Sequence, residues 1–340
     1  MRLASLLLIL LVPIVADAQG TDRWRVRQVQ IENDVFWGTW PLPGRDDRFY
    51  TSGLRVSATK GRFASEDDGD SLPVWLRPVR ARCASCIIYP SIALGQEIYT
   101  PEVIENPEPQ PGDHPWAAWL YVGVGGAVET SELTRHELEV RLGVTGDAAG
   151  GDAGQSMWHG LSGSPDPEGW DNQLGPDVGL NAYYSFQHIL LRAPEDSRIN
   201  WDFVPNVKAA TGTMQTHASI GGTVRFGQNI TGFPYSPIHP HDTRLSVARN
   251  KNLEIYGFVS ADLRAVAYNY FLEGSLFDND PYTVDVKRYV WDFTFGMTAR
   301  FRKYYLTYSI VRRSPEFERT AGADRGVHSF GSLTLTVALR

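Results

Sequence analysis

The sequence predicts an all-β fold, a transmembrane antiparallel β-barrel of about twelve strands with a short helix in an extracellular loop. The chain starts like an exported protein, and after that start no apolar run approaches the roughly 18 residues that a membrane helix requires. Its aromatic content of 12% is high for a soluble domain and suits the aromatic girdles of outer-membrane barrels. Several segments alternate apolar with polar residues over about ten positions, as strands do when one face meets lipid.

Residues 1–18 are expected to be a cleaved signal peptide. A charged second residue precedes an apolar run, and an A-x-A cleavage site ends at Ala18. Residues 19–340 then form a single β-barrel domain in the bacterial outer membrane. A net charge of −7 without any basic block argues against nucleic acid as a partner.

The two cysteines, Cys83 and Cys86, stand close together in the run C-A-S-C. In an exported protein this spacing favours a structural disulfide that closes a small loop. A redox role would want a βαβ setting, and a zinc site would want two more ligands nearby. The sequence shows neither context.

The clearest strand is Tyr289–Arg302, in which aromatic and apolar residues alternate with polar and charged ones. Residues 137–144 and 332–339 repeat this pattern. A soluble β-sandwich also alternates, but aromatic side chains on one face and charges on the other favour the barrel. The twelve expected strands are Trp24–Asn33, Tyr50–Lys60, Ile87–Tyr99, Trp116–Thr130, Leu133–Val144, Val178–Arg192, Trp201–Thr211, His217–Phe226, Leu253–Asn269, Lys287–Arg302, Tyr304–Arg313 and Val327–Leu339.

With both termini in the periplasm, odd-numbered strands run outward, and each connection can be assigned to a side. Short connections at 130–132 and 302–303 fall on the periplasmic side, where tight turns belong. The long segments 61–86 and 227–252 fall there too and depart from that rule. The expected extracellular segments are 34–49, 100–115, 146–176, 270–286 and 314–326.

Polar residues converge at the outward ends of the first strands. The first strand ends outward at Asn33 and Asp34, and the second begins outward near Thr51. The loop after the fifth strand carries Gln155 and His159, whose spacing of four places them on one face of a helix. Alternation turns Gln28, Gln30, Glu32 and Asp34 to one face of the first strand, and Thr51, Gly53, Arg55 and Ser57 to the lumen face of the second.

These residue types favour ester hydrolysis assisted by a cation. Histidine is a natural general base near neutral pH, so His159 is the candidate to activate water. The oxygens of Asn33, Asp34 and Thr51 are hard ligands suited to Ca²⁺. A bound cation stabilises the oxyanion of a reacting carbonyl group, which is usually the largest contribution in ester hydrolysis. The alternative is a polar rim that simply meets water, and the residues alone leave both interpretations open.

Six short motifs follow one another along the chain: E-N-D at 32–34, D-R-F-Y-T-S-G at 47–53, G-Q-E-I-Y-T-P at 95–101, D-H-P-W-A-A-W-L-Y at 113–121, G-Q-S-M-W-H at 154–159 and G-W-D-N-Q-L at 169–174. In this order they resemble the outer-membrane lipid A 3′-O-deacylases, the LpxR-like family. The resemblance covers about the first half of the mature chain, and the second half is similar only in strand pattern. No single motif is specific, but the ordered set is.

The resemblance implies a twelve-stranded barrel with its site at the outer rim, between the barrel wall and a loop helix. The implied reaction removes an ester-linked 3′-acyloxyacyl chain from lipid A of lipopolysaccharide, in a monomer in the outer membrane. His159 would be the base and Gln155 its companion in the site. Asn33 and Asp34 would hold the calcium ion, and Thr51 would complete the polar cluster.

Three positions depart from the family pattern. The segment after the Y-T-P motif, Glu102–Asn106, lacks the lysine that the family can carry there. The segment Gly160–Pro165 lacks the carboxylate expected a little after the histidine. His114 stands where the family has an arginine. These departures concern substrate contacts more than the base or the cation site.

Two other functions are alternatives. One is an outer-membrane phospholipase with a serine nucleophile, although no G-x-S-x-G is present and Ser156 stands in a loop. The other is a catalytically silent barrel with a structural or transport role, and many large lumen-facing side chains disfavour an open pore. The histidine-rich run at 237–242 is expected to be a structural turn, and Arg312-Arg313 to be ordinary rim charges.

Overall fold

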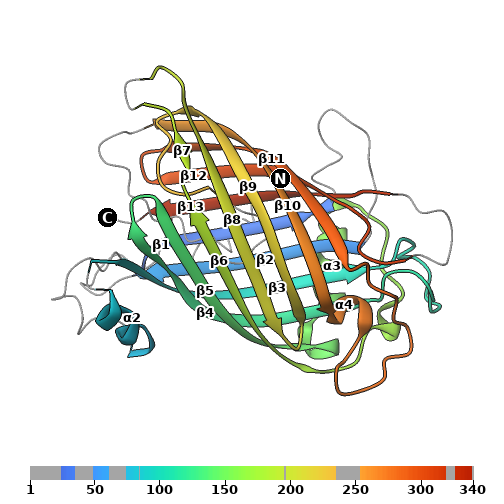
Figure 1. Ribbon diagram of the computed structural model, residues 1–340. Helices are drawn as coiled ribbons and strands as arrows, with labels where there is room; N and C mark the ends of the chain where they lie inside the picture. Colours follow the sequence, from blue (N-terminus) through green and yellow to red (C-terminus); the bar gives the residue numbers. More distant parts are fainter. Residues whose placement is uncertain are drawn as a thin grey trace.

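The computed structural model describes residues 24–34, 49–60, 74–83, 85–194, 197–234, 253–318 and 326–338. They form a closed antiparallel barrel of twelve strands (Figure 1). Except for β6 and β7, consecutive strands are neighbours. β1 pairs with β13, and β6 pairs with β8, which closes the sheet. The two-residue β7 follows β6 in the chain and also pairs with β8. The strands are β1 (Trp24–Asn33), β2 (Phe49–Lys60), β3 (Ile87–Thr100), β4 (Ala117–Ser131), β5 (Thr134–Thr145), β6 (Val178–His188), β7 (Leu191–Arg192), β8 (Asn200–Gly212), β9 (Gln215–Gln228), β10 (Leu253–Asn269), β11 (Tyr289–Phe301), β12 (Tyr304–Arg313) and β13 (His328–Ala338).

All twelve predicted strands are present. The bounds of β1, β10 and β12 coincide with the predicted ones, and the others differ by a few residues. The strand predicted at Val178–Arg192 is divided into β6 and β7. The predicted signal peptide and the run at 237–242 lie outside the described residues, so the signal peptide stays a prediction.

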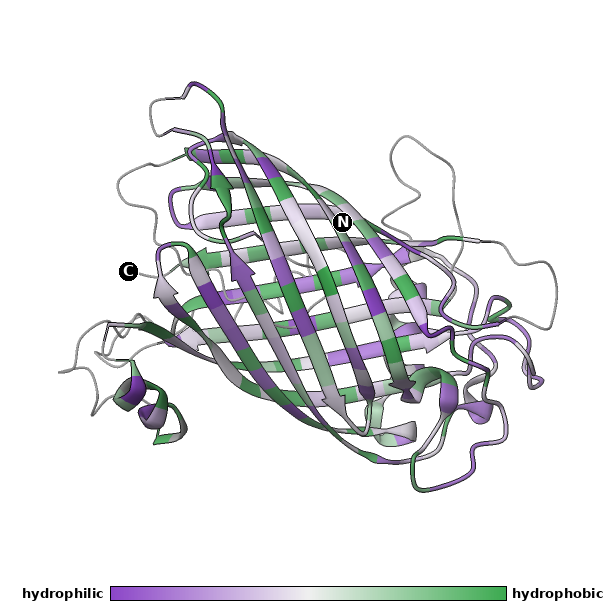
Figure 2. Ribbon diagram, viewed as in Figure 1, coloured by the Kyte–Doolittle hydropathy of each residue, from purple (hydrophilic) through white to green (hydrophobic). Residues whose placement is uncertain are grey.

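The alternation along each strand separates a lipid-facing surface from the lumen. On β11 the lipid-facing Tyr289 is 73% exposed, whereas the lumen-facing Asp292 is 3% exposed. Figure 2 shows the same alternation as hydrophobic and hydrophilic bands along the strands. No helix in the described part of the chain is long and apolar enough to cross a membrane.

The two ends of the barrel differ. One end has the tight turns Ser131–Thr134 and Phe301–Tyr304, and we call it the turn end. The other end, which we call the loop end, carries the helices α3 (Gly151–Ser162) and α4 (Tyr270–Glu273). The loop end also has one tight turn, Gly212–Gln215, beside α4. Because it carries the helical connections, and the longer loops of outer-membrane barrels face outward, the loop end is the extracellular end.

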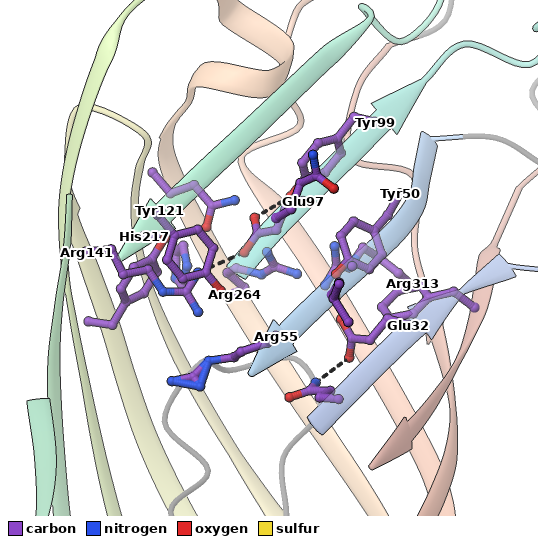
Figure 3. Close-up of a pocket in the computed structure, with 17 residues that line it drawn as sticks. Glu32, Tyr50, Arg55, Glu97, Tyr99, Tyr121, Arg141, His217, Arg264 and Arg313 are labelled. Carbon is purple, nitrogen blue, oxygen red and sulfur yellow. Dashed lines mark hydrogen bonds and ion pairs between the residues drawn. The ribbon is translucent and has the colours of Figure 1, made fainter. Parts of the chain in front are cut away.

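Side chains of opposite charge pair across the lumen. The guanidinium of Arg141 donates to Glu97 at 2.8 Å and to Glu139 at 2.9 Å. Arg264 and Arg313 both bond the Asp292 carboxylate, at 2.6 and 2.7 Å. A polar cavity of about 80 Å³ lies among these pairs, lined by side chains from several strands (Figure 3). Large side chains that cross the interior leave little room for an open channel.

Aromatic side chains close the lumen at the loop end. The rings of Tyr99 and Phe271 stack at 4.1 Å, and His114 lies parallel to Tyr99 at 5.5 Å. His114 Nδ1 lies 2.7 Å from the Pro115 carbonyl, and burial lowers the pKa of His114, which keeps the ring neutral. The histidine that replaces the family arginine is therefore part of this aromatic plug.

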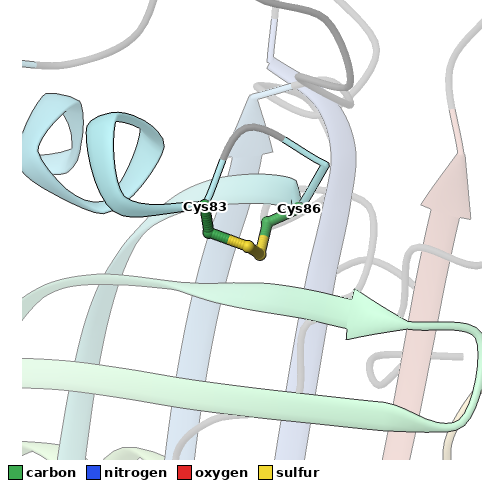
Figure 4. Close-up of a disulfide and its surroundings, with 2 residues drawn as sticks. All are labelled: Cys83 and Cys86. Atoms are coloured by element: carbon green, nitrogen blue, oxygen red, sulfur yellow. A yellow bond between two sulfur atoms is a disulfide. The ribbon is translucent and has the colours of Figure 1, made fainter.

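The disulfide predicted from C-A-S-C is confirmed. Cys83 and Cys86 are bonded, with their Cα atoms 5.4 Å apart (Figure 4). The bond joins the end of α2 (Arg77–Arg82) to the start of β3, at the turn end of the barrel. Its position, remote from α3, agrees with a structural role.

Candidate active site at the outer wall

Three neighbouring strands bring buried polar groups together at the loop end. β1 ends at Asn33, and Asp34 follows it in a helical turn; both side chains are buried. The Asn33 amide nitrogen donates to the Thr51 carbonyl at 2.9 Å. The hydroxyl groups of Thr51 and Thr100 lie 2.6 Å apart. Residues from β1, β2 and β3 thus form one continuous polar cluster.

The predicted lumen orientation of Thr51 is wrong, and a β-bulge is the reason. Tyr50 pairs with Tyr99 and Ser52 with Ile98, so Thr51 is the extra residue between two pairs. Its hydroxyl meets Thr100, which shares the outer face of β3 with Ile98. The remaining lumen assignments on β2 are confirmed by the burial of Gly53, Arg55 and Ser57. The alternation predicted through Asp34 ends one residue earlier, because β1 stops at Asn33.

The helix α3 lies on the outside of the wall, over the same face of β3. Gly150 precedes it with φ of 65°, a conformation that favours glycine. The Gln96 side chain donates to the carbonyls of Ala149 and Gly150, at 2.7 and 3.0 Å, which fastens the start of the helix to β3. A methyl group added at Gly154 would stand 3.2 Å from the side chain of Ile98, so the helix backbone nearly touches the wall.

Gln155 and His159 share the buried face of α3, as their spacing predicts. His159 is 2% exposed, whereas Met157 on the opposite face is 55% exposed. The indole of Trp170 donates to Gln155 Oε1 at 2.9 Å. The buried Gln155 Nε2 has no hydrogen-bond partner among the described residues. This amide therefore presents a buried donor that a bound molecule can satisfy.

The tautomer of His159 follows from one contact. Its Nδ1 lies 2.5 Å from the Pro165 carbonyl oxygen. A carbonyl oxygen only accepts, so Nδ1 carries the proton and Nε2 of the neutral ring keeps its lone pair. The main-chain oxygen of Pro165 therefore orients the ring, although the segment Gly160–Pro165 contains no carboxylate.

The residues proposed for calcium fit that ion in type. Asp34 supplies a carboxylate and Asn33 an amide oxygen, and Ca²⁺ prefers such oxygens. The Asn33 nitrogen is directed to Thr51, so the oxygen of the same amide points to the other side. Both side chains are buried, and a buried carboxylate requires donors or a cation beside it. Within the described ranges no group of three or more His, Cys, Asp or Glu side chains could hold a metal ion.

Three residues of the candidate site were missed by sequence reasoning. Thr100 and Trp170 stand in motifs that were recognised, but only the fold shows that they contact Thr51 and Gln155. Pro165 contributes a main-chain oxygen, for which no side-chain signal exists. Glu32 and Glu97, near the loop-end ends of β1 and β3, face the lumen cavity.

Two glycines of α3 provide a matched test of this packing. A methyl group at Gly151 would stand 2.3 Å from the Trp170 ring and 2.7 Å from Ala118, whereas one at Gly160 meets nothing within 4 Å. Gly151→Ala should displace Trp170 from Gln155 and reduce ester hydrolysis about tenfold or more. Gly160→Ala should leave the hydrolysis rate unchanged, because it only raises helix propensity. Equal rates for the two purified variants would contradict the placement of α3.

The comparisons with known proteins agree with this fold. The family model described as "Outer membrane protein LpxR" matches residues 3–339. The solved structure of LpxR from Salmonella typhimurium superposes with a TM-score of 0.71 at 21% identity, covering 92% of this chain and 99% of that chain. The β domain of the Bordetella autotransporter BrkA superposes with a TM-score of 0.42 at 10% identity, covering 92% of this chain and 97% of that chain. A search of curated proteins gives no significant match.

Proposed function

This chain belongs to the LpxR family of outer-membrane proteins, as its motifs predicted, and from that premise we propose that it deacylates lipid A. The proposed reaction hydrolyses the ester of the 3′-acyloxyacyl chain of lipopolysaccharide in the outer leaflet. One observation in this structure supports the proposal. The polar cluster of Asn33, Thr51 and Thr100 and the helix α3 both lie on the outer side of the wall at the loop end, where β3 contacts both of them, so a lipid ester can approach from the membrane.

The surface below the cluster suits acyl chains. Leu94 on β3 and Val122 on β4 are large, exposed and apolar, and they continue the outer face that carries Ile98. A lipid in the outer leaflet lies along such a face with its ester level with the polar groups at the loop end.

The proposed mechanism uses His159 as the general base. The proton on Nδ1 is held by the Pro165 carbonyl, so Nε2 accepts a proton from the attacking water. The same Nε2 then returns this proton to the alkoxide oxygen of the leaving group. Because His159 is buried against the wall, bulk water does not compete for Nε2.

Gln155 acts beside the base. Trp170 fixes its amide oxygen at 2.9 Å, which leaves Nε2 of the amide turned away from the indole. That buried donor can bond a substrate oxygen and so orient the ester. Calcium, held at Asn33 and Asp34, would stabilise negative charge on the ester carbonyl oxygen.

A serine nucleophile is the rival mechanism, and the geometry disfavours it. The Ser156 hydroxyl donates to Asp152 at 3.0 Å on the exposed side of α3. His159 instead faces the wall with Nδ1 on Pro165. A serine hydrolase requires the hydroxyl to bond the histidine that activates it. We therefore favour direct attack by water.

Mass spectrometry of lipid A tests the proposal. Lipid A from cells expressing the full chain should lose the mass of one acyloxyacyl unit relative to cells with an empty vector, and chelation of calcium in isolated membranes should prevent the loss. Phospholipids of the same membranes are the control substrate, and their fatty acids should stay in place. Unchanged lipid A beside a folded barrel would point to the catalytically silent alternative.

A further inference from the structure

A short basic helix covers the outside of the barrel at the turn end. The turn Val74–Leu76 leads directly into α2, and α2 lies outside the wall, at the end opposite α3 (Figure 1). Leu76 and Val79 pack against Ile88 of β3 and Val128 of β4. The Cys83–Cys86 disulfide fastens the end of this segment to the start of β3 (Figure 4). The helix is therefore a fixed part of the outer surface.

The contacted residues face lipid rather than the lumen. Ile88 has the same parity along β3 as Ile92 and Leu94, which are 42% and 54% exposed on the outer surface. Ile88 itself is 0% exposed, because α2 covers it. Lipid-facing residues of β3 are thus covered at both ends, by α2 over Ile88 and by α3 over Ile98.

The distance between the two covered positions matches the membrane. Ile88 and Ile98 are ten residues apart on one strand, which is roughly 33 Å along the strand at about 3.3 Å per residue. At a strand tilt of about 40° this is roughly 25 Å along the membrane normal, the height of the apolar band of such barrels. α3 then lies at the outer headgroups and α2 at the inner headgroups.

The outward face of α2 is basic. The sequence R-P-V-R-A-R places three arginines in six residues, and Arg77 and Arg82 are exposed. Guanidinium groups bind phosphate oxygens through paired hydrogen bonds, and basic residues at a membrane surface attract anionic lipids. The apolar side of the same helix, Leu76 and Val79, is already used on the wall.

We propose that α2 binds the phosphate headgroups of anionic phospholipids in the inner leaflet. Because α2 lies at the inner headgroups, it does not reach the outer-leaflet lipid that the proposed active site binds. The site holds the turn end of the barrel at the inner membrane surface, independently of the chemistry at α3. The rival partner for these arginines is the acidic run E-D-D-G-D at 66–70 of the same connection.

Photo-crosslinking in cells tests the proposal with the full chain. A photoreactive amino acid replaces Ala81, which is exposed on α2, and in a second protein it replaces Met157 on α3. After irradiation, the lipid attached to each position is identified by mass. Position 81 should capture phospholipid enriched in phosphatidylglycerol and cardiolipin over their share of the membrane, whereas position 157 should capture lipid A.

The double variant Arg77→Gln, Arg82→Gln should lower the anionic enrichment at position 81 about tenfold. A charge-matched control, Arg288→Gln with Arg312→Gln, removes two exposed arginines at the loop end and should leave that enrichment unchanged. Heat-modifiable migration on gels confirms that each variant has folded. Lipid A or a periplasmic protein captured at position 81 would overturn the proposal. An anionic enrichment that the double variant leaves unchanged would also overturn it, since the arginines would then pair with the acidic run instead of with lipid. None of these outcomes depends on deacylase activity.

Discussion

Replacing His159 with asparagine is expected to lower the rate of lipid A deacylation by about 10²- to 10⁴-fold, the usual contribution of a general base. Asparagine keeps a polar side chain of similar reach, and its nitrogen can still donate to the Pro165 carbonyl. It has no group that accepts a proton from water near neutral pH. The measurement is the initial rate of acyl release from purified lipid A in detergent micelles.

The matched control for His159 is Met157→Gln on the same helix. Met157 faces away from the wall, so its replacement should leave the catalytic step intact. Heat-modifiable migration should be the same for both variants, since neither changes the barrel strands. A His159→Asn protein with the wild-type rate would remove the histidine from the mechanism.

Loss of the carboxylate at residue 34 is expected to have the second-largest effect. Asp34→Asn should raise the calcium concentration for half-maximal activity at least about tenfold, because a hard divalent cation loses its charged ligand. The barrel should stay folded, because Asp34 lies beyond the last residue of β1. The measurement is the deacylation rate as a function of free calcium, set by a chelator buffer.

Asp152→Asn is the control for this change, because it removes the same charge from the exposed side of α3. Its calcium dependence should match that of the wild type. A wild-type rate that survives complete chelation, or an unshifted calcium curve for Asp34→Asn, would mean that the family's metal chemistry does not apply at this site.

Most of the fold could be predicted because strand periodicity is a local property. In strands such as β11 and β5 the side chains alternate between the two faces of the sheet. The sequence pattern alone therefore predicts both the strand and the residues on each face. The division between β6 and β7 was not predictable, since both segments have strand-like composition. Three-dimensional pairing with β8 decides where that strand is interrupted.

The site could be predicted only in part, for two physical reasons. Period-two reasoning fails wherever a bulge inserts an extra residue, and Thr51 is such a residue. Contacts between distant segments have no local signature either, and the bond from Trp170 to Gln155 is one of them. The spacing of Gln155 and His159 was informative because helix geometry is local. The end of β1 at Asn33 was predictable because strand periodicity is also local.

The carbonyl of Pro165 has a consequence for how this family can diverge. An orienting oxygen in the main chain is present whatever amino acid is encoded, so it persists through side-chain replacement as long as the backbone keeps its path. A side-chain replacement in the segment Gly160–Pro165 that keeps the backbone path would therefore leave the contact to His159 Nδ1 in place. The shape of this loop, more than the identity of its side chains, then sets the orientation of the ring.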